Sequence, residues 1–180
     1  MSAGRPNEPD ARRGVPGRYT LRAADAADAA EVSALVHATY SHYVPRIGGL
    51  PGPMQDDYAE VIAVRAVTVA ERDAAIAGVV VLGQDEEGFA VENVAVHPGH
   101  QRQGLGGRLL EQAESEALAR GFDSIHLYTH RLMSENRALY SRRGYVEYEP
   151  RARRHEALVY MRKSLRKGPA GETQAPPAGP

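Results

Sequence analysis

The feature that most constrains the fold is a glycine-rich turn between an apolar run and a helical pattern, within residues 94–120 (VAVHPGHQRQGLGGRLLEQAESEALAR). The apolar run is typical of a strand and ends at His97-Pro98-Gly99. The polar turn of residues 101–107 then leads directly into the helix. A strand, a glycine turn and a helix in this order present several unpaired backbone N–H groups at one place. The sequence therefore predicts an anion site here, and a ligand that carries phosphate.

The elements around this turn predict an α/β protein in the α+β sense. The helix of 104–120 has one apolar stripe and connects the strand of 89–96 to that of 124–129, which favours a parallel pair. The earlier strands have short connections typical of antiparallel neighbours. The full prediction comprises strands at 19–22, 65–70, 74–83, 89–96, 124–129, 145–151 and 158–164, helices at 25–40, 55–62, 104–120 and 135–143, and a loop at 41–54.

Composition limits where this fold begins and ends. Residues 1–17 and 167–180 are rich in Gly, Pro and polar side chains without periodicity, so we expect two disordered tails around one domain at 18–166. The formal net charge of −1 gives no reason to expect a nucleic-acid partner. Cysteine is absent, which excludes thiolate zinc sites and a cysteine nucleophile and fits a cytoplasmic location. No apolar run approaches the roughly 18 residues of a membrane span, so we expect no membrane partner.

The glycine turn differs from two common phosphate-binding motifs. A dinucleotide fingerprint requires a third glycine where this chain has Leu109, and a Walker loop requires Gly-Lys-Ser or Gly-Lys-Thr. The chain has instead Q-x-x-G-x-G, formed by Gln101, Gly104 and Gly106 with Arg102 inside it. The two glycines let the backbone close around a pyrophosphate, and the guanidinium adds a charged donor.

Together with the segments before and after it, this motif resembles the GCN5-related N-acetyltransferase (GNAT) family. The resemblance is carried by VENVAVHPGHQRQGLGGRLL and by the downstream SENRALYSRRGYVEY, with its N-x-x-x-Y-x-x-x-G-Y pattern, and the order of elements extends it over most of 18–166. It implies a mixed, mostly antiparallel sheet of six to seven strands, splayed between the fourth and fifth strands, with about four helices. It also implies acetyl-CoA as co-substrate and a homodimer as the candidate assembly.

The resemblance implies two parts of the cofactor site. The main chain of Val94, Ala95 and Val96 is expected to pair with the pantetheine arm, and the turn is expected to hold the pyrophosphate. The expected cofactor-binding residues of the turn are Gln101, Arg102, Gln103, Gly104, Leu105, Gly106 and Gly107.

Asn136 and Tyr140 lie four residues apart and therefore share one side of a short helix. In similar proteins the Asn contacts the cofactor and the Tyr protonates the departing thiolate. A phenol suits this task because it is protonated at neutral pH. One departure is that many members carry the Asn seven residues before this Tyr, where this chain has Met133. The alternative for Tyr140 is a core aromatic whose hydroxyl bonds the backbone.

Glu92 is the candidate general base, acting through water, because similar enzymes often carry one at this position. Strand alternation places Glu92, Val94 and Val96 on one face and Asn93 and Ala95 on the other. A carboxylate in an apolar strand is costly without water or a partner, which favours a cleft. The alternative is a plain exposed strand face.

The histidines do not predict a metal site. His126 and His130 lie four residues apart along a predicted strand, about 13 Å, which is too far to share one ion. We therefore expect no metal.

The sequence favours an acetyl-CoA-dependent N-acetyltransferase that acts on a primary amine by direct transfer in a ternary complex. The expected acceptor is a small amine or an amino-acid-like molecule. The alternatives are a non-catalytic acyl-CoA-binding or sensing module and a protein N-terminal or lysine acetyltransferase.

Overall fold

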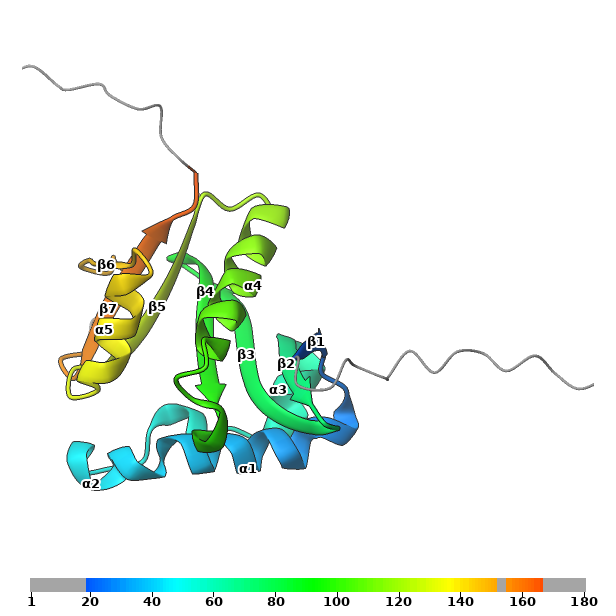
Figure 1. The fold of residues 1–180 in the computed structure, drawn as a ribbon. Helices are drawn as coiled ribbons and strands as arrows, with labels where there is room; N and C mark the ends of the chain where they lie inside the picture. The colour runs from blue at the N-terminus through cyan, green and yellow to red at the C-terminus, as the bar shows by residue number, and fades with distance from the viewer. Residues whose placement is uncertain (1–18, 152–154, 167–180) are drawn as a thin grey trace, which may run out of the picture. The chain divides into compact units, whose positions relative to one another are not determined.

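The computed structural model describes residues 19–151 and 155–166. The expected tails at 1–17 and 167–180 lie outside the described residues. The described part comprises β1 Thr20–Ala23, α1 Ala29–Tyr40, α2 Val44–Ile47, α3 Tyr58–Val64, β2 Ala66–Arg72, β3 Ala75–Asp85, β4 Gly88–Val96, α4 Leu105–Ala119, β5 Ser124–His130, α5 Ser134–Arg142, β6 Val146–Glu147 and β7 Leu158–Ser164 (Figure 1). Four short 3₁₀ helices connect them: η1 Ala26–Asp28, η2 Ser41–Tyr43, η3 Gly52–Met54 and η4 Pro98–His100.

The strands form one mixed sheet in the order β1-β2-β3-β4-β5-β7-β6, which confirms the predicted fold class. The pairs β1–β2, β2–β3, β5–β7 and β6–β7 are antiparallel, and β4–β5 is parallel. The parallel pairing covers only Phe89–Val91 of β4, opposite residues 125–127, and ends there. The later residues of β4 therefore do not pair with β5, which is what the expected splay between these two strands requires.

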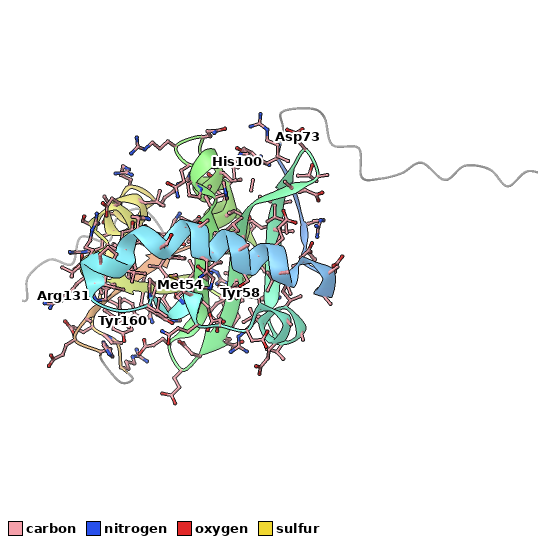
Figure 2. The ribbon with its side chains drawn as sticks, turned by 90° about the horizontal axis from the view of Figure 1, so that it is seen from below. Met54, Tyr58, Asp73, His100, Arg131 and Tyr160 are labelled. Atoms are coloured by element: carbon pink, nitrogen blue, oxygen red, sulfur yellow. The ribbon has the colours of Figure 1, made fainter. Side chains whose placement is uncertain are left out.

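The chain divides into two compact units. The first comprises residues up to Gly83 and residues 92–111, and its core brings together Val32 and Val36 of α1 with Val69 of β2 and Val79 of β3. In Figure 2, α1 runs across the strands of this unit, and Met54 and Tyr58 lie next to it.

The second unit comprises residues 84–91 and residues from 112 onward. Phe89 of β4 packs its ring 5.2 Å from that of Phe122, and the Arg120 guanidinium lies over the Phe89 ring, 5.4 Å from its centroid. Ile125 and Leu127 of β5 and Met161 of β7 are buried here. These side chains form the apolar core of the second unit.

Local signals set several element boundaries. The Asp25 side chain caps the first helical turn by accepting the Ala27 N–H, and the Asp25 N–H donates to the Asp28 carboxylate. Gly121, with φ of 84°, ends α4 in the left-handed conformation. None of the described helices combines the length and apolar character that crossing a membrane requires.

The prediction of a continuous loop at 41–54 is wrong. This segment contains η2, α2 and η3. Pro45 occupies the first turn of α2, where the missing N–H costs nothing, and Gly48, with φ of 72°, ends that helix. The next helix, α3, begins at Tyr58 rather than near residue 55, because Asp57 caps it by accepting the Ala59 N–H. The strand predicted at 145–151 is reduced to the two residues of β6.

Candidate functional site

The glycine turn, residues 101–107, lies between η4 and the start of α4. Arg102 and Gly104 both have positive φ, 60° and 82°, and these angles bend the chain into the helix. The Arg108 N–H is the donor of the helical bond to the Gly104 carbonyl. The amides of residues 105–107 precede that bond and have no partner inside the helix. The turn therefore presents a row of amides suited to an anion.

Hydrogen bonds of two glutamine side chains stabilise the conformation of the turn. Gln101 Nε2 donates to the Val96 carbonyl at 3.0 Å, and Gln103 Nε2 donates to the Gly99 carbonyl at 3.2 Å. The Tyr19 hydroxyl donates to Gln103 Oε1 at 3.1 Å. Both glutamine side chains thus hold the turn in place.

Arg102 and Leu105 have opposite environments within the same turn. The Arg102 side chain is exposed and makes no hydrogen bond or ion pair with any described residue, so its guanidinium is available to a ligand. Leu105 is buried, and its side chain packs over Gly78, where a Cβ would stand 3.3 Å from it. Leu105 therefore anchors the helix start and offers only its amide.

The main chain of Val94–Val96 follows the paired part of β4. Two of its carbonyls already accept side-chain bonds, Val94 from the Tyr40 hydroxyl at 3.1 Å and Val96 from Thr39 Oγ1 at 3.1 Å. The Val96 carbonyl also accepts Gln101 Nε2, so both of its lone pairs are used, whereas the Val94 carbonyl keeps a second lone pair. These contacts fix α1 against the strand and hold its edge in one position.

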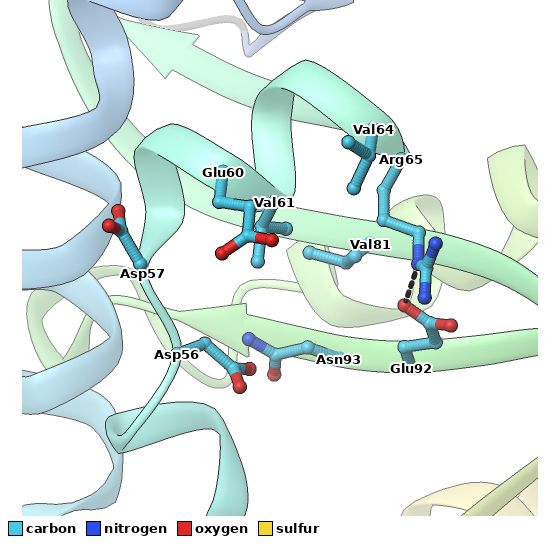
Figure 3. Close-up of a pocket in the computed structure, with 9 residues that line it drawn as sticks. All are labelled: Asp56, Asp57, Glu60, Val61, Val64, Arg65, Val81, Glu92 and Asn93. Atoms are coloured by element: carbon cyan, nitrogen blue, oxygen red, sulfur yellow. Dashed lines mark hydrogen bonds and ion pairs between the residues drawn. The ribbon is translucent and has the colours of Figure 1, made fainter.

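Glu92 lies on β4 and is half-buried, with its side chain 32% exposed. Its Oε2 accepts the Arg65 Nε–H at 2.8 Å (Figure 3). Gly83 lies against the same carboxyl group, since a Cβ there would overlap the Glu92 side chain. The alternation along β4 is as predicted, because Asn93 and Ala95 are buried while Glu92, Val94 and Val96 are partly exposed. Glu92 is therefore held on two sides while it faces an opening.

That opening is a cavity of about 260 Å³, here named the α3 pocket (Figure 3). It is lined by residues of α3 and its N-terminal approach together with residues of β3 and β4: Asp56, Asp57, Glu60, Val61, Val64, Arg65, Val81, Glu92 and Asn93. Loss of hydration raises the pKa of Asp56, and the negative charge of Glu92 adds to that shift.

Asn93 connects the pocket wall to two helices. Its Oδ1 accepts the Tyr40 hydroxyl at 2.9 Å, and its Nδ2 donates to the Tyr58 hydroxyl at 2.9 Å. The Tyr58 hydroxyl in turn donates to the Pro53 carbonyl. Burial raises the pKa of Tyr58, and the charge of Asp56 raises it further, so the phenol is a stable donor.

Tyr140 and Asn136 lie on α5, in the second unit. Tyr140 is buried, and its ring packs 6.0 Å from that of Tyr145. Its carbonyl accepts the Tyr145 N–H, which ties the helix end to the following turn. Asn136 Nδ2 lies 3.6 Å from Met133 Sδ. Met133, which stands where many similar proteins carry the Asn, is therefore in contact with Asn136.

Sequence reasoning missed the groups that position Glu92 and Asn93. Arg65 and Gly83 hold Glu92, while Tyr40 and Tyr58 hold Asn93. One signal was available, since a carboxamide inside an apolar strand requires hydrogen-bond partners. Among the residues that the structure describes, no group of three or more His, Asp or Glu side chains is arranged to hold a metal ion.

Comparisons with known proteins agree with this architecture. Residues 63–147 match the acetyltransferase (GNAT) domain family. No curated protein sequence matches the chain. Among solved structures, it is similar to the PaiA N-acetyltransferase of Thermoplasma acidophilum in complex with coenzyme A, with 15% identity and a TM-score of 0.71 over 82% of this chain and 99% of that one.

Two further structures have the same fold. YncA of Salmonella typhimurium, a putative acetyltransferase solved with acetyl-CoA, is 23% identical with a TM-score of 0.63, over 87% of this chain and 99% of that one. The ribosomal-protein-S18-alanine N-acetyltransferase of Escherichia coli is 18% identical with a TM-score of 0.64, over 88% of this chain and 99% of that one.

Proposed function

The chain carries an acetyltransferase domain of the GNAT family over residues 63–147, and on this premise we propose that it is an acetyl-CoA-dependent N-acetyltransferase acting on a primary amine. The observation that carries the proposal is the glycine turn, whose amides at the start of α4 have no partner inside the helix. The solved relatives with coenzyme A and acetyl-CoA support the same co-substrate.

The residues present fit this co-substrate. The amides of residues 105–107 and the exposed guanidinium of Arg102 supply hydrogen-bond donors and positive charge for a pyrophosphate. The part of β4 that lies beyond its pairing with β5, Val94–Val96, supplies main-chain groups for the amide-containing pantetheine arm. A backbone N–H near Val94 or Ala95 is the candidate donor to the thioester carbonyl.

We assign proton removal to Glu92. The acceptor amine forms an N–C bond to the thioester carbonyl carbon, the C–S bond breaks, and the nitrogen loses a proton. Glu92 takes that proton through a water molecule, since its carboxylate faces the α3 pocket and is held by Arg65. Transfer is direct, within a ternary complex, and no covalent enzyme intermediate is formed.

We assign proton donation to Tyr140, which gives its phenolic proton to the departing thiolate, and cofactor contact to Asn136. The burial of Tyr140 and the packing of its ring on Tyr145 support a fixed orientation of the hydroxyl. A general acid at this step contributes a factor of about 100 or more to the rate.

The test combines binding with turnover. Calorimetry is expected to show acetyl-CoA binding by the purified protein, and thiol detection to show release of free CoA with a panel of amines. Tyr140→Phe is expected to lower kcat about 100-fold with an unchanged Kd for acetyl-CoA. Unchanged turnover removes the acid role. Binding without turnover of any amine or peptide supports the sensing module in place of the enzyme.

The acceptor class is part of the proposal. A small amine or amino-acid-like acceptor fits a cavity of about 260 Å³. A protein N-terminus or lysine is the alternative, and peptides in the amine panel test it. The cytoplasmic location and the homodimer stay predictions, which cell fractionation and light scattering test.

A further inference from the structure

Tyr19 lies outside the motifs that the sequence indicates as functional, yet its hydroxyl reaches the glycine turn. The hydroxyl lies 3.1 Å from His100 Nδ1 in η4 and donates to Gln103 Oε1 in the turn, also at 3.1 Å. These partners are 81 and 84 positions away in the chain. Tyr19 directly precedes β1 and is buried. One buried side chain before the first strand therefore contacts both η4 and the turn.

Three further contacts hold Tyr19 itself in place. Arg108 Nη1, in the first turn of α4, donates to the Tyr19 carbonyl at 3.4 Å. The Arg72 guanidinium of β2 lies over the Tyr19 ring, 5.6 Å from its centroid. The His100 ring meets the same ring edge-on, with the two centroids 5.7 Å apart. The hydroxyl and the carbonyl of Tyr19 thus contact the chain on both sides of the amides of residues 105–107.

The direction of these hydrogen bonds follows from the protons available. Gln103 Nε2 donates to the Gly99 carbonyl, so Gln103 Oε1 is an acceptor and receives the single hydroxyl proton of Tyr19. The Tyr19 oxygen must then accept from His100, whose Nδ1 carries the proton. The result is a closed network, here named the Tyr19 network, that leaves η4 at His100 and returns to it at Gly99.

The Tyr19 network restrains a strained part of the turn. Arg102 has φ of 60°, a left-handed conformation that is costly for a residue with a side chain. Such a conformation persists only where the surroundings enforce it. The residues on both sides of Arg102 are fixed, Gln101 by its bond to the Val96 carbonyl and Gln103 by its two bonds in the network. Without the Tyr19 hydroxyl, Gln103 keeps only one of these bonds.

We propose that Tyr19 is a positioning residue of the acetyl-CoA site, which holds the glycine turn in the conformation that binds the pyrophosphate. This inference rests on the proposed function, because that function assigns the pyrophosphate to the turn. Tyr19 acts through Gln103 and His100 rather than by touching the ligand. A turn that is already ordered loses less conformational freedom on binding. Tyr19 therefore contributes to the affinity for acetyl-CoA and leaves the acetyl transfer itself unchanged.

Tyr19→Phe tests this role, because it removes the hydroxyl and keeps the buried ring. Calorimetry is expected to show Kd for acetyl-CoA raised about fivefold, the effect of one or two partly exposed hydrogen bonds. The value of kcat at saturating acetyl-CoA and amine is expected to stay within about twofold. Tyr148→Phe removes a hydroxyl in the second unit and is the matched control, with an expected Kd equal to that of the wild type. Thermal unfolding is measured for every variant.

Two further measurements distinguish positioning from a general loss of stability. Gln103→Met breaks the Tyr19 network at its other side and is by itself expected to raise Kd. In the double variant, the rise in Kd is expected to be smaller than the product of the two single effects, because both substitutions break the same network. NMR above about pH 8, where histidine is neutral, is expected to show the His100 proton on Nδ1 in the wild type and to show that preference lost in Tyr19→Phe.

The outcomes separate this inference from the function beneath it. Unchanged Kd in both Tyr19→Phe and Gln103→Met overturns the positioning role, while binding by the wild type preserves the acetyl-CoA site. Single effects that multiply in the double variant, or a fall in kcat as large as the rise in Kd, also overturn it. So does a His100 proton on Nε2 in the wild type. Failure of the wild type to bind acetyl-CoA overturns the proposed function and this inference together.

Discussion

The glycine turn and the α3 pocket lie in the same unit but are built from different parts of the chain. The turn works through its backbone, because two positive φ angles and the first amides of α4 form it while its glutamines bond inward. The pocket works through side chains from separate elements, held in place by one another. A substitution in the turn therefore acts through conformation, and one in the pocket acts through charge and position.

The largest expected effect is in the pocket. Glu92→Gln keeps the size of the side chain and removes its capacity to accept a proton, so kcat at saturating amine is expected to fall about 100-fold. Because the turn is untouched, Kd for acetyl-CoA is expected to stay within about twofold. Steady-state kinetics and calorimetry measure the two quantities, and a large loss of acetyl-CoA affinity contradicts the separation of the two regions.

A second substitution moves the Glu92 carboxylate without replacing Glu92 itself. Gly83→Ala places a Cβ where the Glu92 carboxyl group now lies, so the flexible side chain must move away from Arg65. We expect a partial loss of kcat, about tenfold, with an unchanged Kd for acetyl-CoA. Wild-type kcat in this variant means that the position of Glu92 does not matter to the reaction.

The next effect is in the turn. Gly104 has open space around it, so Gly104→Val meets no neighbour and acts only through its φ of 82°. A β-branched residue pays about 1–2 kcal/mol or more in that region, and we expect Kd for acetyl-CoA to rise about tenfold. Gly104→Asn is the matched control, because Asn tolerates the left-handed conformation and is expected to bind nearly as wild type. Equal affinities of the two variants contradict a backbone-built site.

The smallest expected effect is that of Arg102→Ala, which tests how much charge contributes to binding by the turn. Arg102→Ala removes the exposed guanidinium and leaves an L-residue at the same positive φ, so only the charge is lost. An exposed ion pair is worth at most about 1 kcal/mol, and we expect Kd for acetyl-CoA to rise about threefold at low salt and less at high salt. A loss larger than that of Gly104→Val shows that charge, rather than backbone, dominates the turn.

The sequence predicted those parts of the molecule that local rules encode. The apolar stripe of α4, its end at Gly121 and the alternating faces of β4 follow from periods and turn residues within a short window. The helical turns inside 41–54 contradict the predicted loop, because Pro and Gly do not always break a helix. Pro45 in fact stands in a first helical turn, where proline is tolerated.

The same distinction, between local sequence patterns and long-range contacts, applies to the candidate site. By itself, the sequence determined the glycine turn and the outward face of Glu92, because both depend on neighbouring residues and on backbone geometry. Only the tertiary structure decided what surrounds Glu92 and Asn93: Arg65 lies 27 positions from Glu92 in the chain, and Tyr58 and Tyr40 lie 35 and 53 positions from Asn93. Such contacts arise from the packing of α1 and α3 against the strands, and no local pattern specifies them. The turn indicates what the co-substrate is, whereas the surroundings of Glu92 exist only in the folded chain.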